Sequence, residues 1–255
     1  SRVDFGAGIG VSRSMFNYGY FNNFNNGTFA GLGSNSTIVY NEGTWNFTAP
    51  GAALVDQNVI FVNDGNLIVD RATATFGNLF NLHLASNELT GGFWQVSGGG
   101  QLKTPAGGGV SKIGSGASVA ILGTNSRFDA LYPCTTIDGT LIVDGGATLS
   151  LYPPALGTVT QNSGYIGVGA YSHLYVQGAF WQRGGTIGRQ FQDATQLGSG
   201  IFDVLLTSTF SGNLFCLFLD QTQINVGNEF TIAKLAPSAC CGVYGPFASV
   251  EINGN

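Results

Sequence analysis

One short segment occurs twice in this chain, and its repetition limits the folds that the chain can adopt. Asp64–Asp70 reads DGNLIVD, Asp138–Asp144 reads DGTLIVD, and a weaker echo, GYIGVG, covers Gly164–Gly169. The spacings between these segments fit steps of about 25 residues, a period typical of solenoid repeats. A β-branched run between glycines or aspartates is typical of a strand between two turns. The repetition therefore predicts a coiled stack of strands.

The composition agrees with a packed β protein. Of the 255 residues, 44% are hydrophobic and only 9% are charged, whereas an ordinary globular domain carries about 25% charged residues. Lys and Glu, the usual residues of exposed helices, are scarce, and no segment shows a capped 3.6-residue periodicity. The 40 glycines suit tight corners, because glycine adopts positive φ without strain. We therefore expect an all-β fold with almost no helix.

The pattern divides the chain into three stretches. Residues 1–35 mix aromatic residues and asparagines without a clean two-residue alternation, and they predict an irregular N-terminal arm or cap. Residues 36–210 contain short strand patterns bounded by Gly, Asn, Asp or Pro, and they predict the solenoid itself. Residues 211–255 predict a C-terminal cap or closing module. The expected strands include Thr37–Tyr40, Val59–Val62, Leu67–Val69, Phe80–Leu84, Ser118–Leu122, Thr140–Val143, Thr148–Leu151, His173–Val176 and Phe215–Leu219.

The aromatic and Asn-rich run at residues 16–26 has two interpretations. Aromatic and Asn side chains stack in ladders between adjacent strands, so the run is suited to cover the open end of its own solenoid. Alternatively, it pairs with a neighbouring molecule, because an uncovered end exposes unpaired N–H and C=O groups. In that case the self-association contact consists of Phe16, Tyr18, Tyr20, Phe21 and Phe24.

Charge and hydropathy exclude two classes of partner. The formal net charge is −5, and the 9 Lys and Arg residues form no basic stripe, which argues against a nucleic-acid partner. No apolar run reaches the length of about 20 residues that a membrane-spanning helix needs, so we expect no membrane insertion. The chain begins at Ser1 without a signal-peptide pattern, which suggests a processed form.

Sequons and cysteines favour an extracellular or cell-surface location. Three N-glycosylation sequons begin at Asn26, Asn35 and Asn46, and each predicts a glycan in a turn-rich region. The cysteines have neither zinc-finger nor CxxC spacing, so they are either buried free thiols or two disulfides. Beside the sequons and the low charge, we favour disulfides. The cysteines are Cys134, Cys216, Cys240 and Cys241.

The C-terminal stretch resembles a known family. Gly227–Ile232 reads GNEFTI and Gly245–Val250 reads GPFASV. This pair is similar to the terminal element of secreted right-handed parallel β-helix surface proteins, such as adhesins and autotransporter passengers. The segments DGNLIVD and GTLIVDGGATLSL resemble the coils of the same proteins. The resemblance implies a right-handed parallel β-helix and secretion, whereas it says little about activity.

Cys240 and Cys241 depart from the family pattern as an insertion. The insertion suggests a local disulfide from Cys216 to Cys240 or Cys241, since adjacent cysteines rarely bridge each other. Cys134 then pairs with the remaining cysteine or stays buried and free.

No residue set has the pattern of a catalytic site. Asp64, Asp70, Asp138 and Asp144 lie at strand edges, where aspartate commonly caps a turn. Two copies of the repeat, separated by three coils, would lie too far apart for a paired-carboxylate mechanism. We therefore expect no catalytic residues.

The histidines and tryptophans show no metal or cofactor pattern either. His83 and His173 lie inside strand patterns without a second ligand nearby. Trp45, Trp94 and Trp181 would stack on sugars if they were exposed, although Trp in a strand is more often core. We expect neither a metal nor a cofactor.

These patterns favour a structural protein over an enzyme. We expect a secreted, glycosylated, stiff rod in an extracellular filament, cell surface or matrix, whose partners are copies of itself joined end to end. The alternative is a carbohydrate-binding adhesin or spike, with carbohydrate or other surface proteins as partners. A polysaccharide lyase or hydrolase comes third, because parallel β-helices are a familiar scaffold for such enzymes.

Overall fold

The computed structural model shows stacked parallel strands that form a β-solenoid of about eight turns, with about 24 residues in each turn. It describes residues 2–5, 9–11, 13–23, 27–31, 37–48, 50–105, 109–191, 198–218, 231, 234–235 and 243–253. Within these ranges the helical elements are two short 3₁₀ helices, η1 (Asp129–Leu131) and η2 (Pro154–Leu156). The predictions of an all-β fold and of a parallel β-solenoid are confirmed.

The chain forms two compact units, and each is described separately. The first comprises Ser1–Val110 and Gly116–Leu131, and the second comprises Ser111–Ser115 and Tyr132–Asn255. Strand β15 (Lys112–Leu122) contributes residues to both. In both units, strands that lie about 24 residues apart in the sequence are direct neighbours.

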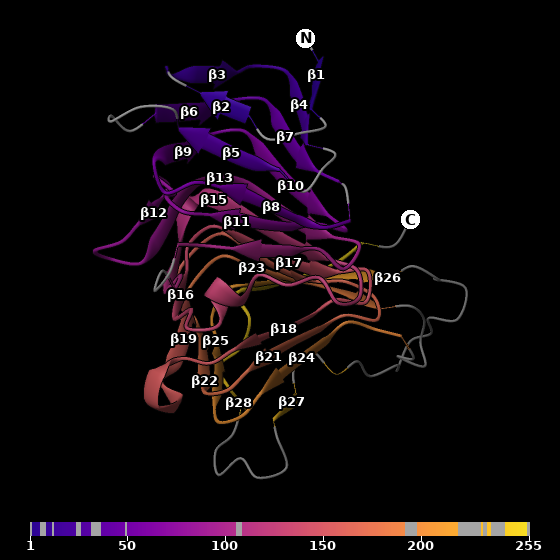
Figure 1. Cartoon of the computed structure of the whole chain (residues 1–255). Helices are drawn as coiled ribbons and strands as arrows, with labels where there is room; N and C mark the ends of the chain where they lie inside the picture. The colour runs from indigo at the N-terminus through magenta and orange to yellow at the C-terminus, as the bar shows by residue number, and fades with distance from the viewer. Residues whose placement is uncertain are drawn as a thin grey trace. The chain divides into compact units, whose positions relative to one another are not determined.

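The first unit arranges its strands in three parallel columns (Figure 1). The first column is β1 (Arg2–Phe5), β4 (Tyr20–Asn23), β7 (Thr44–Phe47), β10 (Asn66–Asp70) and β13 (Glu88–Ser97). The second is β2 (Ile9–Val11), β5 (Thr28–Gly31), β8 (Ala52–Val55), β11 (Thr73–Phe76) and β14 (Gln101–Lys103). The third is β3 (Met15–Asn17), β6 (Thr37–Asn41) and β9 (Val59–Asn63).

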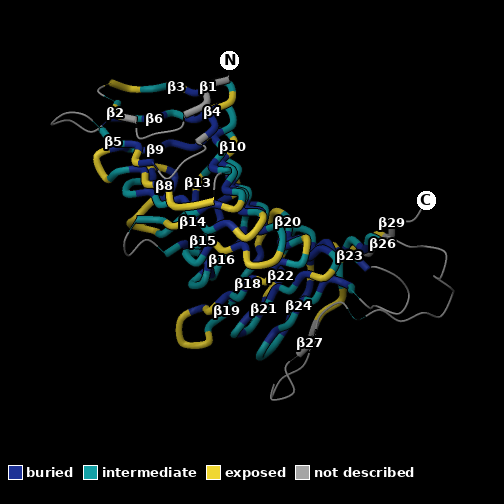
Figure 2. The backbone as a smooth tube through the Cα atoms, turned by 45° about the vertical axis from the view of Figure 1, so that its right-hand side comes forward, coloured by how far each residue is buried: buried dark blue, intermediate teal, exposed yellow. Residues whose placement is uncertain are grey.

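A row of large apolar side chains forms part of the core of this unit. Phe21, Trp45, Leu67 and Trp94 are register partners along β4, β7, β10 and β13, and none is more than 2% exposed. The rings of Phe21 and Trp45 stack with their centroids 3.8 Å apart. Because neighbouring strands lie about 4.8 Å apart, each side chain contacts its equivalent in the next coil. Figure 2 shows buried and intermediate stretches alternating along the backbone.

A row of asparagines stabilises the corner between the third column and the next coil. Asn17 donates from Nδ2 to Asn41 Oδ1, and Asn41 donates from Nδ2 to Asn63 Oδ1, each at 2.7 Å. Asn41 Nδ2 also donates to the backbone carbonyl of Asn66 at 2.9 Å. Asn41 and Asn63 are completely buried, so the ladder satisfies polar groups that water cannot reach.

The solenoid begins before the predicted boundary at residue 36. Strands β1 to β5 lie within residues 2–31, and β1 pairs in parallel with β4, which pairs with β7. The alternation was missed because exposed aromatic residues occupy outward positions of these strands, while Asn17 faces inward as a rung of the ladder. The described part of the predicted N-terminal arm therefore belongs to the first coils.

The second unit repeats the three-column arrangement. The first column is β16 (Thr136–Ile137), β19 (Thr158–Gln161), β22 (Ala179–Gln182), β25 (Ser208–Phe210) and β28 (Val243–Tyr244). The second is β17 (Thr140–Asp144), β20 (Tyr165–Val168), β23 (Thr186–Phe191), β26 (Asn213–Phe218) and β29 (Ser249–Asn253). The third is β18 (Thr148–Leu151), β21 (His173–Val176), β24 (Ile201–Val204) and β27 (Lys234–Leu235).

The C-terminal strands continue these columns. β26 pairs with β29 in parallel over five residues, from Asn213↔Ser249 to Leu217↔Asn253. The described part of the predicted closing module is therefore solenoid as well. The GNEFTI segment lies outside the described residues except for Thr231.

Two segments have a structure that their sequence patterns do not indicate. The predicted strand Phe80–Leu84 shrinks to β12 (Leu82–His83), which runs antiparallel to β13, and Phe80 and Leu84 are exposed. The tripeptide Phe-Trp-Gln occurs twice in the sequence, at residues 93–95 and 180–182, and its two copies turn opposite side chains toward the core. Trp94 faces the core, whereas Trp181 faces outward and Phe180 is buried instead.

We predict that Asn41→Ala lowers the free energy of unfolding of the first unit by about 3 kcal/mol, because it leaves buried amide groups of the ladder without partners. Urea titration followed by the fluorescence of Trp45 and Trp94, which both lie in this unit, measures the change. The matched control is Asn66→Ala, whose exposed side chain reaches only Thr44 Oγ1 at 3.5 Å and whose loss we expect to cost less than about 0.5 kcal/mol. Equal losses for the two variants would contradict the importance of the ladder.

Candidate functional site

The four repeat aspartates lie at corners and take part in local contacts. Asp138 accepts a hydrogen bond from Asn162 Nδ2 at 3.0 Å and lies 3.2 Å from Lys112 Nζ. Asp144 accepts one from the backbone N–H of Gly145 at 2.6 Å. Asp70 pairs with the side chain of Arg71, and Asp64 accepts from Asn81 Nδ2 at 3.4 Å. These contacts are those of turn and corner residues.

The histidines lie apart from any cluster of metal ligands. His83 is exposed and its Nδ1 lies 2.8 Å from Ser86 Oγ. His173 Nε2 lies 3.0 Å from Asp203 Oδ2 on the outer face of β21 and β24. Within the described part of the chain, no group of three or more His, Cys, Asp or Glu residues is placed to hold a metal ion.

The cysteines that the structure describes are free thiols. Cys134 is fully buried, and burial raises the pKa of its thiol to about 12. Cys216 faces the core of the second unit, where burial raises its pKa and the Arg189 guanidinium opposes that rise. Both thiols are free in the structure, so the expected disulfide of Cys216 is not present in it. Cys240 and Cys241, the proposed partners, lie outside the described residues.

Of the three sequon asparagines, Asn46 lies within the described residues. Asn26 and Asn35 lie outside the described residues. Asn46 donates from Nδ2 to Asn22 Oδ1 at 2.8 Å on neighbouring strands. A glycan on Asn46 would be attached to this same Nδ2 atom, and glycosylation at all three sites stays a prediction.

Most of the expected aromatic contact residues are exposed, but not all. Phe16, Tyr18 and Tyr20 are 52%, 71% and 58% exposed, and together they form the N-terminal aromatic patch. The Phe16 ring stacks on Tyr40 at 4.8 Å and on Tyr18 at 6.0 Å. Tyr18 is thus the exposed end of a stack of three rings.

Two other residues of that prediction belong elsewhere. Phe21 is a core residue, 2% exposed against Trp45, so assigning it to a surface contact was wrong. Phe24 lies outside the described residues. Of the tryptophans, Trp45 and Trp94 are buried, while Trp181 is 41% exposed with the Arg183 guanidinium 5.2 Å from its ring centroid.

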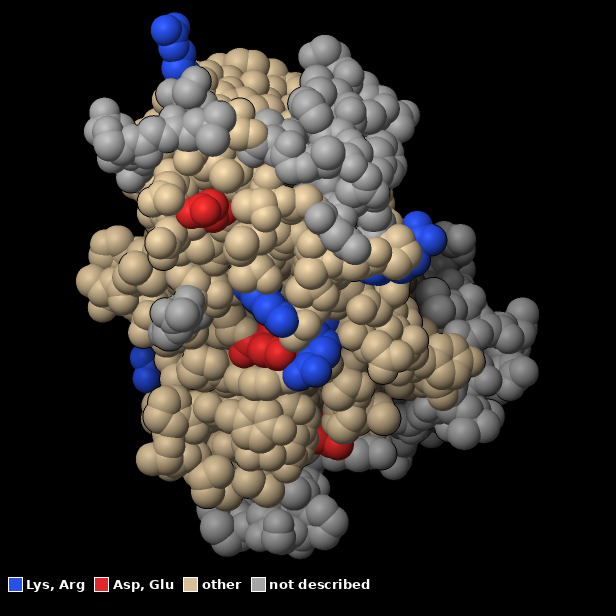
Figure 3. Space-filling view, in the orientation of Figure 1, with Lys and Arg blue, Asp and Glu red and all other residues tan. Residues whose placement is uncertain are grey.

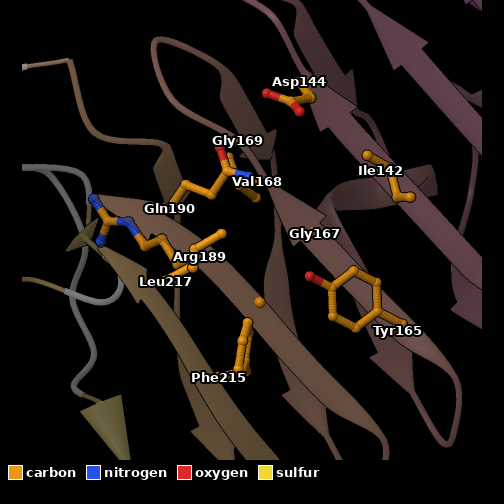
Figure 4. Close-up of a pocket in the computed structure, with 11 residues that line it drawn as sticks. Ile142, Asp144, Tyr165, Gly167, Val168, Gly169, Arg189, Gln190, Phe215 and Leu217 are labelled. Carbon is orange, nitrogen blue, oxygen red and sulfur yellow. The ribbon is translucent and has the colours of Figure 1, made fainter. Parts of the chain in front are cut away.

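The second unit has a pocket of about 190 Å³ on the outer face of its second column. Its residues come from β17, β20, β23 and β26 and the corners that follow them (Figure 4). They are Ile142, Asp144, Tyr165, Gly167, Val168, Gly169, Gly188, Arg189, Gln190, Phe215 and Leu217.

Two glycines create the space in which a tyrosine ring lies. A Cβ added to Gly188 would lie 1.9 Å from Tyr165 Oη, and one added to Gly167 would lie 2.7 Å from Tyr165 Cε1. The ring therefore covers two side-chain-free positions on neighbouring strands, as aromatic residues do when they pack over glycine in sheets. Burial raises the pKa of the Tyr165 hydroxyl, and the Asp144 carboxylate raises it further.

Sequence reasoning missed this pocket. The signal for half of it was present in the GYIGVG segment, where Tyr165 and Gly167 are two residues apart and so face the same side of a strand. Gly188 and Phe215 join them only through the register of β20, β23 and β26.

Comparisons with family models, curated proteins and solved structures found no match to this chain. Across the described residues, no helix is both long enough and apolar enough to cross a membrane.

We predict that iodoacetamide labels neither Cys134 nor Cys216 in the native protein at neutral pH, because both thiols are buried and the reactive thiolate is suppressed. After unfolding without reductant, both cysteines should be labelled. The raised pKa of Cys134 also contributes stability that is present below pH 9 and is lost as the pH rises toward about 12.

Peptide mapping reads both cysteines separately. Labelling of Cys216 only after reduction would show that it is bridged, as the sequence analysis expected. Fast labelling of Cys134 in the native protein would contradict its buried position.

Proposed function

We propose that this protein is a structural component of an extracellular filament, cell surface or matrix, and that it self-associates end to end through the first coil of its first unit. The observation that carries the proposal is the stack of Tyr40, Phe16 and Tyr18, which ends on an exposed ring. The Phe16 ring contacts both Tyr40 and Tyr18, and the Tyr18 ring is 71% exposed. A second molecule can extend the same stack from Tyr18.

The backbone of the first coil supports the same contact. β2 and β3 are the outermost strands of their sheets in the described part of the chain. An outermost strand carries N–H and C=O groups directed away from its neighbour, and these groups can pair with a strand of another chain. The aromatic patch and the strand edges occupy the same end of the first unit.

The free energies involved show why the aromatic patch and the strand edges are both needed for association. An aromatic pair contributes about 0.5–1.5 kcal/mol beyond its buried area, so the three exposed rings together contribute only a few kcal/mol. Association costs about 4–15 kcal/mol in lost translational and rotational freedom. Strand pairing at the edge must supply the rest, and the rings then fix the lateral position of the contact.

The low surface charge permits such close contact between copies. Figure 3 shows a face on which charged residues are few and scattered among uncharged ones. A strongly charged surface would repel a second copy. The three sequons support the extracellular location.

We predict that the full chain sediments as concentration-dependent oligomers and that Tyr18→Ser together with Tyr20→Ser shifts it toward monomer, by at least about tenfold in dissociation constant. Both side chains are exposed, so the variant should keep its fold. Analytical ultracentrifugation measures the shift.

Phe80→Ser is the control, because Phe80 is also an exposed aromatic residue of the first unit, at 68%, but lies outside the patch. A monodisperse monomer at high concentration would end the proposal. An equal shift in the dissociation constant of the Phe80→Ser control would show that association depends on general surface hydrophobicity and not on the aromatic patch.

A further inference from the structure

We propose that the pocket on the second unit is a carbohydrate subsite that holds one uncharged sugar ring. The proposal stands on residues of the second unit alone. It is independent of self-association through the first unit.

The size of the pocket limits the ligand to one ring. Pockets for drug-sized ligands occupy about 300–1,000 Å³, whereas this one measures about 190 Å³. It lies on the open outer face of a sheet, so the rest of a longer chain can continue outside it. A terminal or internal residue of a glycan fits both conditions.

The floor and one wall are aromatic. Figure 4 shows the Tyr165 ring face-on, lying over the strand face, with Phe215 beside it seen nearly edge-on. The glycines at 167 and 188 allow the ring to lie flat, because a Cβ at either position would clash with it. A sugar ring has one face of C–H groups and an edge of hydroxyls, and the C–H face packs against a flat aromatic ring.

Hydrogen-bond donors and hydrogen-bond acceptors border this aromatic floor. The carboxylate of Asp144 is an acceptor, and the Tyr165 hydroxyl is both donor and acceptor. Gln190 accepts the backbone N–H of Ala170 on Oε1 at 3.1 Å, which orients its Nε2 as a donor. A hydroxyl both donates and accepts, so a row of sugar hydroxyls can use all three groups.

The charge of the site selects among ligands with a flat apolar face. Asp144 disfavours an acidic sugar, because its carboxylate would face another. A quaternary ammonium group would suit Tyr165, Phe215 and Asp144, but it could not use the donor of Gln190. Figure 4 shows the guanidinium of Arg189 directed away from Tyr165, so it does not offer a binding group for an anion on the floor.

Saturation-transfer NMR on the full chain tests the proposal with methyl glycosides of glucose, galactose, mannose and N-acetylglucosamine. Methyl glucuronide is the acidic probe, and choline is the cationic probe. We expect transfer to at least one neutral glycoside, strongest at the C–H protons of one ring face. Tyr165→Leu, which still covers the glycines, and Asp144→Asn, which keeps the acceptor for Gly145, should each weaken binding by about tenfold or more.

Tyr175→Leu is the matched control. Tyr175 also faces outward from the second unit, on β21, but it lies outside the pocket. Thermal unfolding shows whether each variant is folded. Absence of transfer to every neutral glycoside, retention of transfer in both pocket variants, or binding of choline in place of the glycosides would overturn the proposal.

Discussion

The structure depends on the in-register stacking of successive coils at the spacing of neighbouring strands. Each inward side chain lies beside its register partner one coil away, so an inward row of like groups must tolerate contact between its own members. Apolar rows do so by packing, as Phe21, Trp45 and Leu67 show. The buried asparagine row does so because its middle amide both donates to one neighbour and accepts from the other. The amide of asparagine can do both, which explains the ladder from Asn17 to Asn63.

The same constraint acts on the corners. Where two coils turn at the same place, their backbones approach closely and leave no room for a side chain. A Cβ on Gly65 would lie 2.2 Å from the carbonyl oxygen of Gly43, and one on Gly43 would lie 2.2 Å from that of Gly19. The glycine in the first DG corner of the repeat, Gly65, is therefore a consequence of stacking. This is why a short repeat of Asp, Gly and β-branched residues indicates the fold so directly.

Outward side chains do not have to pack against their equivalents in a closed core. Both candidate surfaces, the N-terminal aromatic patch and the pocket of the second unit, consist of such outward positions. The N-terminal aromatic patch uses the outward faces of β3 and β4 and the corner between them. The pocket uses outward positions of four neighbouring strands, two of them left empty by glycine. A solenoid of this kind can change its surface one row at a time while its core and corners remain fixed.

The sequence could predict the fold class, the period and most of the strands, because these follow from the alternation and from glycine at corners. It could not predict where the solenoid begins, since outward aromatic residues such as Phe16 and Tyr20 hide the alternation there. It also placed Phe21 on the surface, because phase within a short strand depends on pairing with Trp45. The pocket was beyond sequence reasoning for the same reason, since Tyr165 meets Gly188 only through register.

Cross-linking of register partners tests the stacking most directly. Thr160 and Trp181 are paired outward positions on β19 and β22, whereas Thr158 pairs with Ala179 and lies two residues out of register with Trp181. The account predicts that Thr160→Cys with Trp181→Cys forms a disulfide on mild oxidation, because paired Cα atoms fall within the range of about 4.4–6.8 Å that a disulfide allows. Thr158→Cys with Trp181→Cys should stay reduced. Equal oxidation of the two pairs, or preference for the second, would contradict the in-register parallel stack.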